Sequence, residues 1–179
     1  MEQHAGATPI ERGHGAPGTL PAHYTISWQD DRGGLYEVAD PYAFAPLIDD
    51  GTLRAFNGGA HRRVHQFLGA QARDVDGIAG VQFALWAPNA ERVSVVGDFN
   101  LWDGRRHPMR VRGSSGVWEL FIPGIGPGTL YKFEIRNRDN GTIHLKTDPY
   151  GRQFEKRPAT AAIVATSSRH TWQDRTCSR

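Results

Sequence analysis

Cysteine is nearly absent from this sequence. Among 179 residues only Cys177 carries a thiol, so neither a disulfide within the chain nor a zinc site built from several cysteines can form. Such cysteine usage is typical of a reducing compartment. No stretch approaches the roughly 20 consecutive apolar residues of a membrane span, and the N-terminal segment lacks the apolar core of a signal peptide. We therefore predict a cytoplasmic protein with no membrane partner.

Clustered positive charge is also lacking. The formal net charge is +2, and the Lys and Arg residues are scattered rather than gathered in one stripe, which argues against nucleic acid as the main partner. The eight histidines show no spacing of a ligand set. His61 and His65 lie four residues apart, but the two arginines between them favour a solvated surface over a metal site. The sequence predicts neither a metal nor another cofactor.

Turn-forming residues, in contrast, are abundant. The chain contains 21 glycines and 11 prolines, and 39% of its residues are hydrophobic. That apolar content is enough for a packed core, and the many turns favour an all-β domain. The length suits one domain with flanking segments.

The first part of the chain is poor in large apolar side chains. Residues 1–23 cannot bury enough apolar surface to offset the entropy of ordering, so we predict a disordered leader. Residues 24–38 predict a hairpin, which needs further structure to pack on because a lone hairpin is marginally stable in water. Residues 46–50 predict a short helical turn. The apolar spacing in 62–68 predicts a short amphipathic helix, with Gly69 as its stop.

From residue 81 onward apolar residues recur at a period of two, as expected of strands with one buried face. The clearest series alternates Tyr131, Phe133 and Ile135 with charged residues, and Asp139 to Gly141 form a strong hairpin turn signal. Strands are predicted at 81–85, 93–95, 118–122, 131–135, 143–145 and 161–164. This number and length of strands predicts an all-β fold, an immunoglobulin-like β-sandwich of the E-set or glycogen-binding-module type, with the short hairpin and short helix before it.

The same alternation assigns individual side chains to faces. Trp86 and Trp118 stand within apolar strands, so both are predicted to lie in the core. Glu119 and Glu134 are predicted to face solvent from the polar side of their strands. Asp98 is predicted to stabilise the turn in which it lies.

No arrangement of residues indicates a catalytic site. The serine pairs at 114–115 and 167–168 lack the strand–turn–helix context of a nucleophile elbow. The glycine-rich stretch 124–128 lacks the Lys-Ser/Thr pair of a phosphate loop and contains a proline, so it is predicted to join two strands. The acidic residues show no spacing that would pair two carboxyl groups across a cleft, as glycosidic chemistry requires. We assign no catalytic residue.

A binding surface fits the sequence better. Trp102 follows Asn100 in a polar loop and is the best candidate for an exposed ring on which the apolar face of a sugar can stack. Lys132 projects from the polar face of the clearest strand and can donate hydrogen bonds to hydroxyl groups. The alternatives are a Trp102 ring folded back on the core as a loop anchor, and a Lys132 that is an ordinary solvated side chain.

Several ordered motifs run through the predicted sandwich. Residues 83–90 read FALWAPNA and residues 93–104 read VSVVGDFNLWDG, with DPYAF, GVWELFIP, YKFE and KTDPY at 40–44, 116–123, 131–134 and 146–150. Together they resemble the glycogen-binding-type module, carbohydrate-binding module family 48, as found in bacterial 1,4-α-glucan branching enzymes. The resemblance implies a module that precedes an (α/β)8-barrel, which cleaves an α-1,4 linkage and re-forms it as α-1,6.

The resemblance also implies a division of the chain. Residues 24–60 correspond to the end of a preceding sandwich and a linker, 61–165 to the module, and 166–179 to the start of a linker toward the barrel. A barrel takes about 250 residues, so the family's catalytic carboxylates match nothing here, and the chain is predicted to be inactive alone. The implied partners are α-glucan (glycogen) and a catalytic barrel in cis or trans, with self-association through the docking face.

The implied sugar site is incomplete. Trp102 and Lys132 match two positions at which glycogen-binding members hold the sugar, and Asn100 belongs to the same loop. A second stacking tryptophan is replaced by Leu145, and the late polar residue falls within 160–162, so weak glucan affinity is expected. Three hypotheses stay open: a module segment of a branching enzyme in glycogen biosynthesis, a free-standing regulatory module that recruits a partner enzyme to glucan, and a packing domain without a sugar site.

Overall fold

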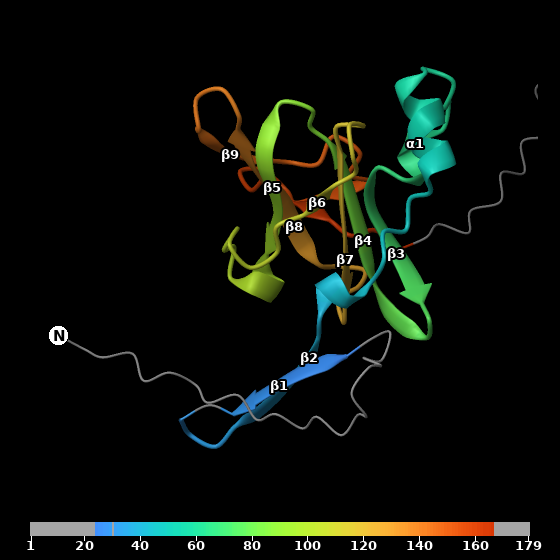
Figure 1. The fold of residues 1–179 in the computed structure, drawn as a ribbon. Coiled ribbons are helices and arrows are strands. Elements are labelled where there is room, and N and C mark those ends of the chain that lie inside the picture. Colours follow the sequence, from blue (N-terminus) through green and yellow to red (C-terminus); the bar gives the residue numbers. More distant parts are fainter. Residues whose placement is uncertain (1–23, 30, 167–179) are drawn as a thin grey trace, which may run out of the picture.

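The molecule is a β-sandwich with a small helix on one side and a separate hairpin at one end (Figure 1). The computed structural model describes residues 24–29 and 31–166. Its helical segments are η1 Pro41–Ala43, α1 Asp50–Asn57, η2 Val64–Gln66 and η3 Asp98–Asn100. Its strands are β1 Thr25–Gln29, β2 Leu35–Ala39, β3 Gly69–Val75, β4 Ile78–Trp86, β5 Ala90–Gly97, β6 Arg110–Val111, β7 Val117–Pro123, β8 Leu130–Asn137, β9 Ile143–Lys146, β10 Gln153–Phe154 and β11 Ala162–Ile163.

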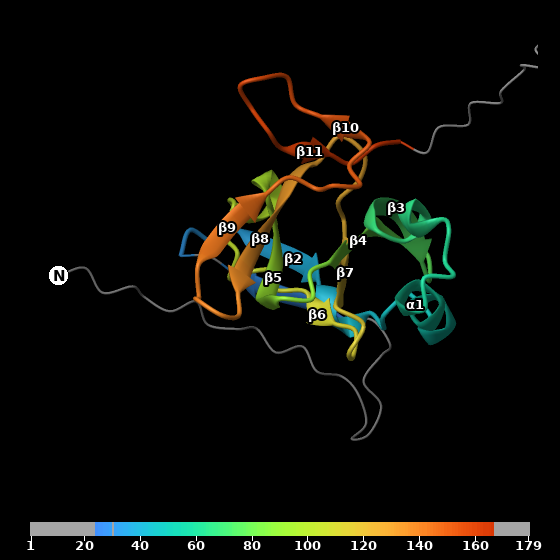
Figure 2. The same cartoon turned by 90° about the horizontal axis from the view of Figure 1, so that it is seen from above.

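Two antiparallel sheets form the sandwich. The first has the strand order β3-β4-β7-β6, and the second has the order β10-β11-β8-β5, with β9 also paired to β8. Seen from above, β9 and α1 lie on opposite sides of the sandwich (Figure 2). The predicted all-β, immunoglobulin-like class is confirmed, and the six strands predicted by periodicity fall on β4, β5, β7, β8, β9 and β11.

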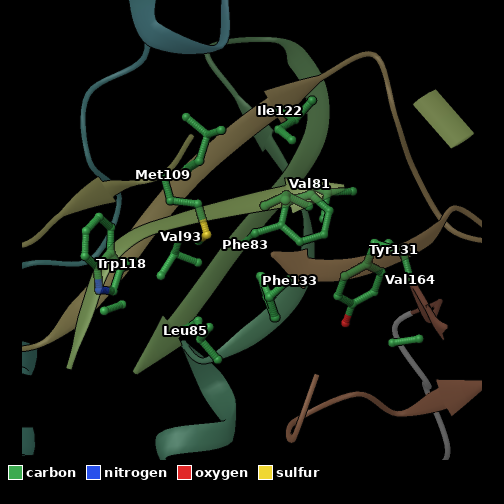
Figure 3. Close-up of a cluster of buried hydrophobic side chains, with 14 residues drawn as sticks. Val81, Phe83, Leu85, Val93, Met109, Trp118, Ile122, Tyr131, Phe133 and Val164 are labelled. Atoms are coloured by element: carbon green, nitrogen blue, oxygen red, sulfur yellow. The ribbon is translucent and has the colours of Figure 1, made fainter. Parts of the chain in front are cut away.

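The core lies between the two sheets (Figure 3). It is lined by the inward-facing members of the period-two pattern, since alternate residues of a strand point to the same face. Phe83 and Phe133 come from opposite sheets and are both fully buried. The largest of the other members are Val81, Leu85, Val93, Val95, Met109, Trp118, Leu120, Ile122, Tyr131 and Val164. Trp118 is thus in the core, as predicted.

A second apolar cluster covers the outer face of the first sheet. Ile48, Leu53 and Phe67 come from α1 and its flanking segments, and they pack on Ala84 of β4 and Val117 of β7. Strands β4 and β7 are therefore buried on both faces. This explains why their sequences are apolar almost throughout rather than alternating cleanly.

The cover over the first sheet overturns the predicted exposure of Glu119. Its side chain is only 2% exposed, because the segment before α1 lies directly on it. One carboxylate oxygen accepts from the backbone N–H groups of Leu47 at 2.7 Å and Ile48 at 3.0 Å. It also accepts from Nε2 of Gln82 at 2.7 Å, while Arg112 binds the other oxygen at 2.5 Å. Glu134, in contrast, faces outward and is partly exposed, as predicted.

Trp86 was also assigned to the wrong environment. It was predicted to lie in the core, but it is the last residue of β4 and is 53% exposed. Phe56 of α1 contacts its ring edge-on, with centroids 6.1 Å apart. Because Trp86 lies at the rim of the covered face, the sheet cannot shield its other side.

The helical predictions near residues 46–68 were shifted. The helix begins at Asp50 instead of spanning 46–50, because Asp49 accepts the N–H of Thr52 at 2.8 Å and acts as the N-cap. The amphipathic helix predicted at 62–68 is only the single 3-10 turn η2. Gly69 does not end a helix; it opens β3 with a φ of +89°, where an added Cβ would approach Tyr150 to 3.1 Å.

The predicted hairpin is present as β1 and β2, which pair with each other from Thr25↔Ala39 to Gln29↔Leu35. Among the described residues it joins neither sheet of the sandwich. It leaves Ile26, Leu35 and Val38 at least 48% exposed. The hairpin as the remainder of a preceding sandwich stays a prediction, and the predicted leader and most of the C-terminal linker lie outside the described residues. No helix in the described part of the chain has the length and apolar character to cross a membrane.

Candidate functional site

Trp102 is presented by a tight loop at the end of β5. After Gly97 the chain forms the short 3-10 turn η3, and Leu101 and Trp102 follow with φ angles of +58° and +59°. Two successive non-glycine residues in the left-handed region are uncommon and carry a conformational cost. The surrounding hydrogen bonds must therefore hold this loop in place.

Asn100 provides those hydrogen bonds. Its Oδ1 accepts from the N–H of Gly97 at 2.9 Å, and its Nδ2 donates to the carbonyl of Val95 at 2.9 Å. Nδ2 also lies 2.9 Å from Nδ1 of His107. Asn100 has no exposed surface, so its predicted direct contact with sugar does not fit this geometry. The amide has the role of shaping the loop that displays Trp102.

The Trp102 ring is held at its edge and partly open to solvent. Nε1 donates to Oδ1 of Asp98 at 2.8 Å, and the backbone N–H donates to the carbonyl of Gly97 at 2.9 Å. Asp98 thus orients the ring as well as belonging to the turn. The residue remains 36% exposed, beside a Leu101 that is 75% exposed. The ring is thus hydrogen-bonded at its edge and partly exposed, and Trp102 is not a member of the buried core cluster.

The loop then folds over the outer face of the second sheet. Gly104 lies directly against Glu134 of β8, where a Cβ would come within 2.2 Å of a carboxylate oxygen. A side chain at position 104 would force the end of the Glu134 side chain to move. The carboxylate of Glu134 pairs with Arg92 of β5 at 2.6 Å. Trp102 is therefore carried to the same face as the charged residues of β8.

Lys132 lies on that face, two residues before Glu134 on β8. Its Nζ donates to Oγ1 of Thr160 at 2.7 Å. Thr147 holds the same segment by donating to the carbonyl of Thr160 at 2.6 Å. Leu145 of β9 is paired with Glu134 across the ladder and is 51% exposed. The structure thus brings Lys132, Leu145 and Thr160 to one exposed surface.

The charges near Trp102 are internally paired. Arg105 donates to both oxygens of Asp103, at 2.9 Å and 2.7 Å. These hydrogen bonds hold the pKa of the Asp103 carboxyl well below its usual range. Burial lowers the pKa of His107 at the base of the loop. The loop therefore offers an apolar ring next to neutralised charge, a setting suited to a neutral polar ligand.

The sequence did not predict that the carboxylates of Glu119 and Asp148 are buried. Both have hydrogen-bond partners within the chain. Glu119 is bound by Arg112, and Asp148 accepts from the Tyr131 hydroxyl at 2.6 Å and from the Tyr150 N–H at 2.8 Å. Burial raises the pKa of Asp148. In the described ranges no three His, Cys, Asp or Glu side chains come together as a metal site would require.

The two packed antiparallel sheets define an immunoglobulin-like β-sandwich module. Residues 67–151 match the model of carbohydrate-binding module 48 (Isoamylase N-terminal domain). The part of the chain that forms most of the sandwich is therefore similar to this family. Trp102, Lys132 and Leu145 lie inside the matched region, whereas Thr160 lies beyond it.

The chain is similar to the N-terminal part of bacterial branching enzymes. It is 60% identical over 156 residues to the 1,4-alpha-glucan branching enzyme GlgB of Methylococcus capsulatus, covering 87% of this chain and 21% of that protein. It is 56% identical over 162 residues to GlgB of Nitrosococcus oceani, covering 90% and 22%. The chain thus spans about a fifth of the length of these curated relatives. Among solved structures, ligand-free PulA from Klebsiella pneumoniae aligns with 80% of this chain and 13% of its own, at 21% identity and a TM-score of 0.48.

Proposed function

We propose that this chain is the carbohydrate-binding segment of a 1,4-α-glucan branching enzyme and associates weakly with α-glucan. The observation that carries the proposal is the Trp102 ring, fixed by Asp98 and left open on the face that also bears Lys132. The match of residues 67–151 to a carbohydrate-binding family and the branching-enzyme relatives support the choice of α-glucan as ligand. Bond cleavage and transfer belong to a catalytic barrel, which acts in cis or trans with this segment.

The chemistry of the surface suits a glucose ring. The C–H face of the ring stacks on Trp102, while Lys132 and Thr160 offer a cation and a hydroxyl to the sugar hydroxyls. Leu145 is apolar and exposed but lacks the flat ring of a second aromatic residue. One aromatic platform and few polar partners correspond to a dissociation constant of about 1 mM, or about −4 kcal/mol. The single cysteine fits a cytoplasmic location for such a module.

Affinity electrophoresis in gels that contain glycogen tests this proposal. We expect the full chain to be retarded and Trp102→Ala to migrate as it does without glycogen. Trp86→Ala is the matched control, because Trp86 is also exposed but lies at the end of β4, in the first sheet. Absence of retardation in the unaltered chain would contradict the proposal. An equal loss of retardation in the Trp102→Ala and Trp86→Ala variants would also contradict it.

A packing role is favoured by a separate observation. A groove of about 470 Å³ runs between the β1–β2 hairpin and the adjacent end of the sandwich, and its lining includes Val38, Ile78, Phe99 and Ile125. We propose that this end of the molecule docks on the rest of the parent enzyme. The isolated chain should then self-associate, and a monomer at high concentration by light scattering would argue against docking here.

Catalytic activity is proposed to be absent from this chain alone. The iodine spectrum of amylose should stay unchanged after incubation with the purified chain, because the family's catalytic carboxylates match none of its residues. A measurable spectral change that copurifies with the chain would overturn this part of the proposal.

A further inference from the structure

His107 lies at the base of the Trp102 loop, against the amide that shapes this loop. Its backbone is held to β5, because its carbonyl accepts from the N–H of Val95 at 3.1 Å. Its ring packs edge-on against Phe99, with centroids 5.4 Å apart and planes at 67°. In this position Nδ1 lies 2.9 Å from Nδ2 of Asn100. Backbone and ring contacts thus place the imidazole in hydrogen-bond range of the amide.

The direction of the hydrogen bond between the two side chains is fixed by the backbone of β5. Oδ1 of Asn100 accepts from the N–H of Gly97, and Nδ2 donates to the carbonyl of Val95. A reversed amide would place oxygen against a carbonyl and NH2 against an N–H, so one orientation satisfies both groups. Because Nδ2 is a donor, Nδ1 of His107 must accept. This bond therefore requires a neutral imidazole that carries its proton on Nε2.

A second proton on the ring is incompatible with this arrangement. It turns Nδ1 into a donor, so two donors face each other at 2.9 Å beside an Asn100 that has no exposed surface. The ring must rotate or the amide must move, and the hydrogen bond is lost in either case. Leu101 and Trp102 follow Asn100 directly and hold left-handed backbone angles. A displaced amide therefore disturbs the residue that displays the indole.

The charges around the ring favour its neutral form. Burial and the nearby Arg106 guanidinium lower the pKa of His107 below its ordinary 6.5. Asp103, on the same loop, lies 3.9 Å from Arg106, and Asp98 of η3 accepts from the indole N–H. Glu37 of β2 lines the same groove as His107. Within the described residues none of these three carboxylates pairs with the ring, so none stabilises a protonated imidazole.

We propose that His107 is a positioning residue for sugar binding, whose neutral ring holds Asn100 and the Trp102 loop in place and whose protonation releases the loop. The effect on sugar rests on the proposed function, whereas the coupling of His107 to Trp102 rests on the hydrogen bonds alone. The affinity for α-glucan should be constant at neutral pH and fall as the pH drops through the lowered pKa of His107. Because only the neutral fraction is competent, the fall approaches about tenfold per pH unit.

Nuclear magnetic resonance of the full chain without glucan, from about pH 5 to pH 8, tests the coupling. The ring signals of His107 and the indole N–H signal of Trp102 should titrate with one midpoint. His107→Asn keeps an acceptor oxygen close to the position of Nδ1 but has no proton to gain in this range, so the Trp102 titration should disappear. His65→Asn is the matched control, because His65 is exposed and lies in η2, and it should keep the titration.

Titration with maltotriose at pH 7 and at about pH 5 measures the consequence for binding. The unaltered chain should bind more weakly at the lower pH, whereas His107→Asn should bind about equally at both. His107→Phe keeps a ring against Phe99 but removes the acceptor. It should bind about three- to tenfold more weakly than the unaltered chain at pH 7, with no further loss at the lower pH. His107→Asn alone decides the test where His107→Phe does not fold.

The outcomes separate the positioning role from sugar binding itself. A Trp102 signal that stays constant while His107 titrates would overturn the inference and leave the proposed function intact. An equal loss of affinity at low pH in His107→Asn and in the unaltered chain would also overturn it. A Trp102 titration that disappears in His107→Asn supports the inference even where neither protein binds maltotriose, and in that case only the proposed function fails.

Discussion

The outer faces of the two sheets carry similar sequence patterns but lie in different environments: the outer face of the first sheet is covered, and that of the second is open to solvent. On the second sheet, Glu134 faces outward with its side chain 20% exposed and pairs with Arg92. On the first sheet, Glu119 occupies an equivalent outward position on β7 but is 2% exposed. The difference arises from residues 44–57, which lie more than 60 positions earlier and cover only one face. Strand periodicity tells which way a side chain points, but a distant segment decides whether it meets water.

The largest effect should come from removing the buried carboxylate. Glu119→Ala leaves Arg112, whose side chain is 12% exposed, without its close partner and frees two backbone N–H groups. We expect a loss of about 3–5 kcal/mol in the free energy of unfolding. Glu134→Ala, the outward counterpart, should cost about 0–1 kcal/mol. Urea denaturation of both variants checks this, and equal losses would refute the contrast between the faces.

Asn100→Ala should disrupt the loop that presents Trp102. The change leaves the Gly97 N–H and the Val95 carbonyl without their side-chain partner, at a cost of about 2–3 kcal/mol. Retardation on glycogen should fall as well, because the left-handed loop loses its support. Asn140→Ala, in the exposed β8–β9 turn, is the control and should keep full retardation. Normal retardation by a destabilised Asn100→Ala protein would show that the loop holds its shape without this amide.

The buried Asp148 should give the molecule a pH signature. Burial raises the pKa of this carboxyl above its ordinary 3.8, so the neutral form is favoured in the folded state. Its contribution to stability is therefore fully present below about pH 4 and is lost as the pH rises through the folded pKa. Asp148→Asn removes this titration, so relative to the unaltered protein the variant should gain stability as the pH rises above about 4. Urea denaturation across that range tests the sign; parallel curves would contradict it.

The smallest change in stability is expected at Lys132. Lys132→Met should alter the free energy of unfolding by less than about 0.5 kcal/mol, because the lost bond to Thr160 is exposed. Glucan binding should weaken about three- to tenfold through the lost donor. Lys146→Met on β9 is the control, since Lys146 pairs with Phe133 and so points to the other face. Maltotriose titration measures the affinity of both variants. Equal weakening of binding in the two would show that Lys132 has no specific role in glucan binding.

The sequence was informative where one face of a strand meets the core and the other meets water. Tyr131, Phe133 and Ile135 alternate cleanly because β8 lies in that setting. Strand β3 was missed because its residues are small or polar apart from Val75 and are partly exposed at a sheet edge, which leaves little periodic signal. Trp86 was wrongly predicted to be buried because it continues the apolar run of β4 beyond the part of the strand that α1 and its flanking segments cover.

The candidate site, like the fold, could be predicted from the sequence only in part. Trp102 and Lys132 were predicted from a loop motif and a strand face, and the structure exposes the first and partly exposes the second. The burial of Asn100 depends on how the loop folds back on β5, and the approach of Gly104 to Glu134 depends on contacts across strands. No local pattern encodes such contacts.

The carboxylate of Glu119 also sets an order of events in folding. It binds the N–H groups of Leu47 and Ile48 across separations of 72 and 71 residues, so we expect their docking to follow the pairing of β4 with β7. This segment adds no strand to either sheet of the sandwich. Amide hydrogen exchange at Leu47 and Ile48 should therefore report partial opening of the α1 cover well before the strands of the core exchange.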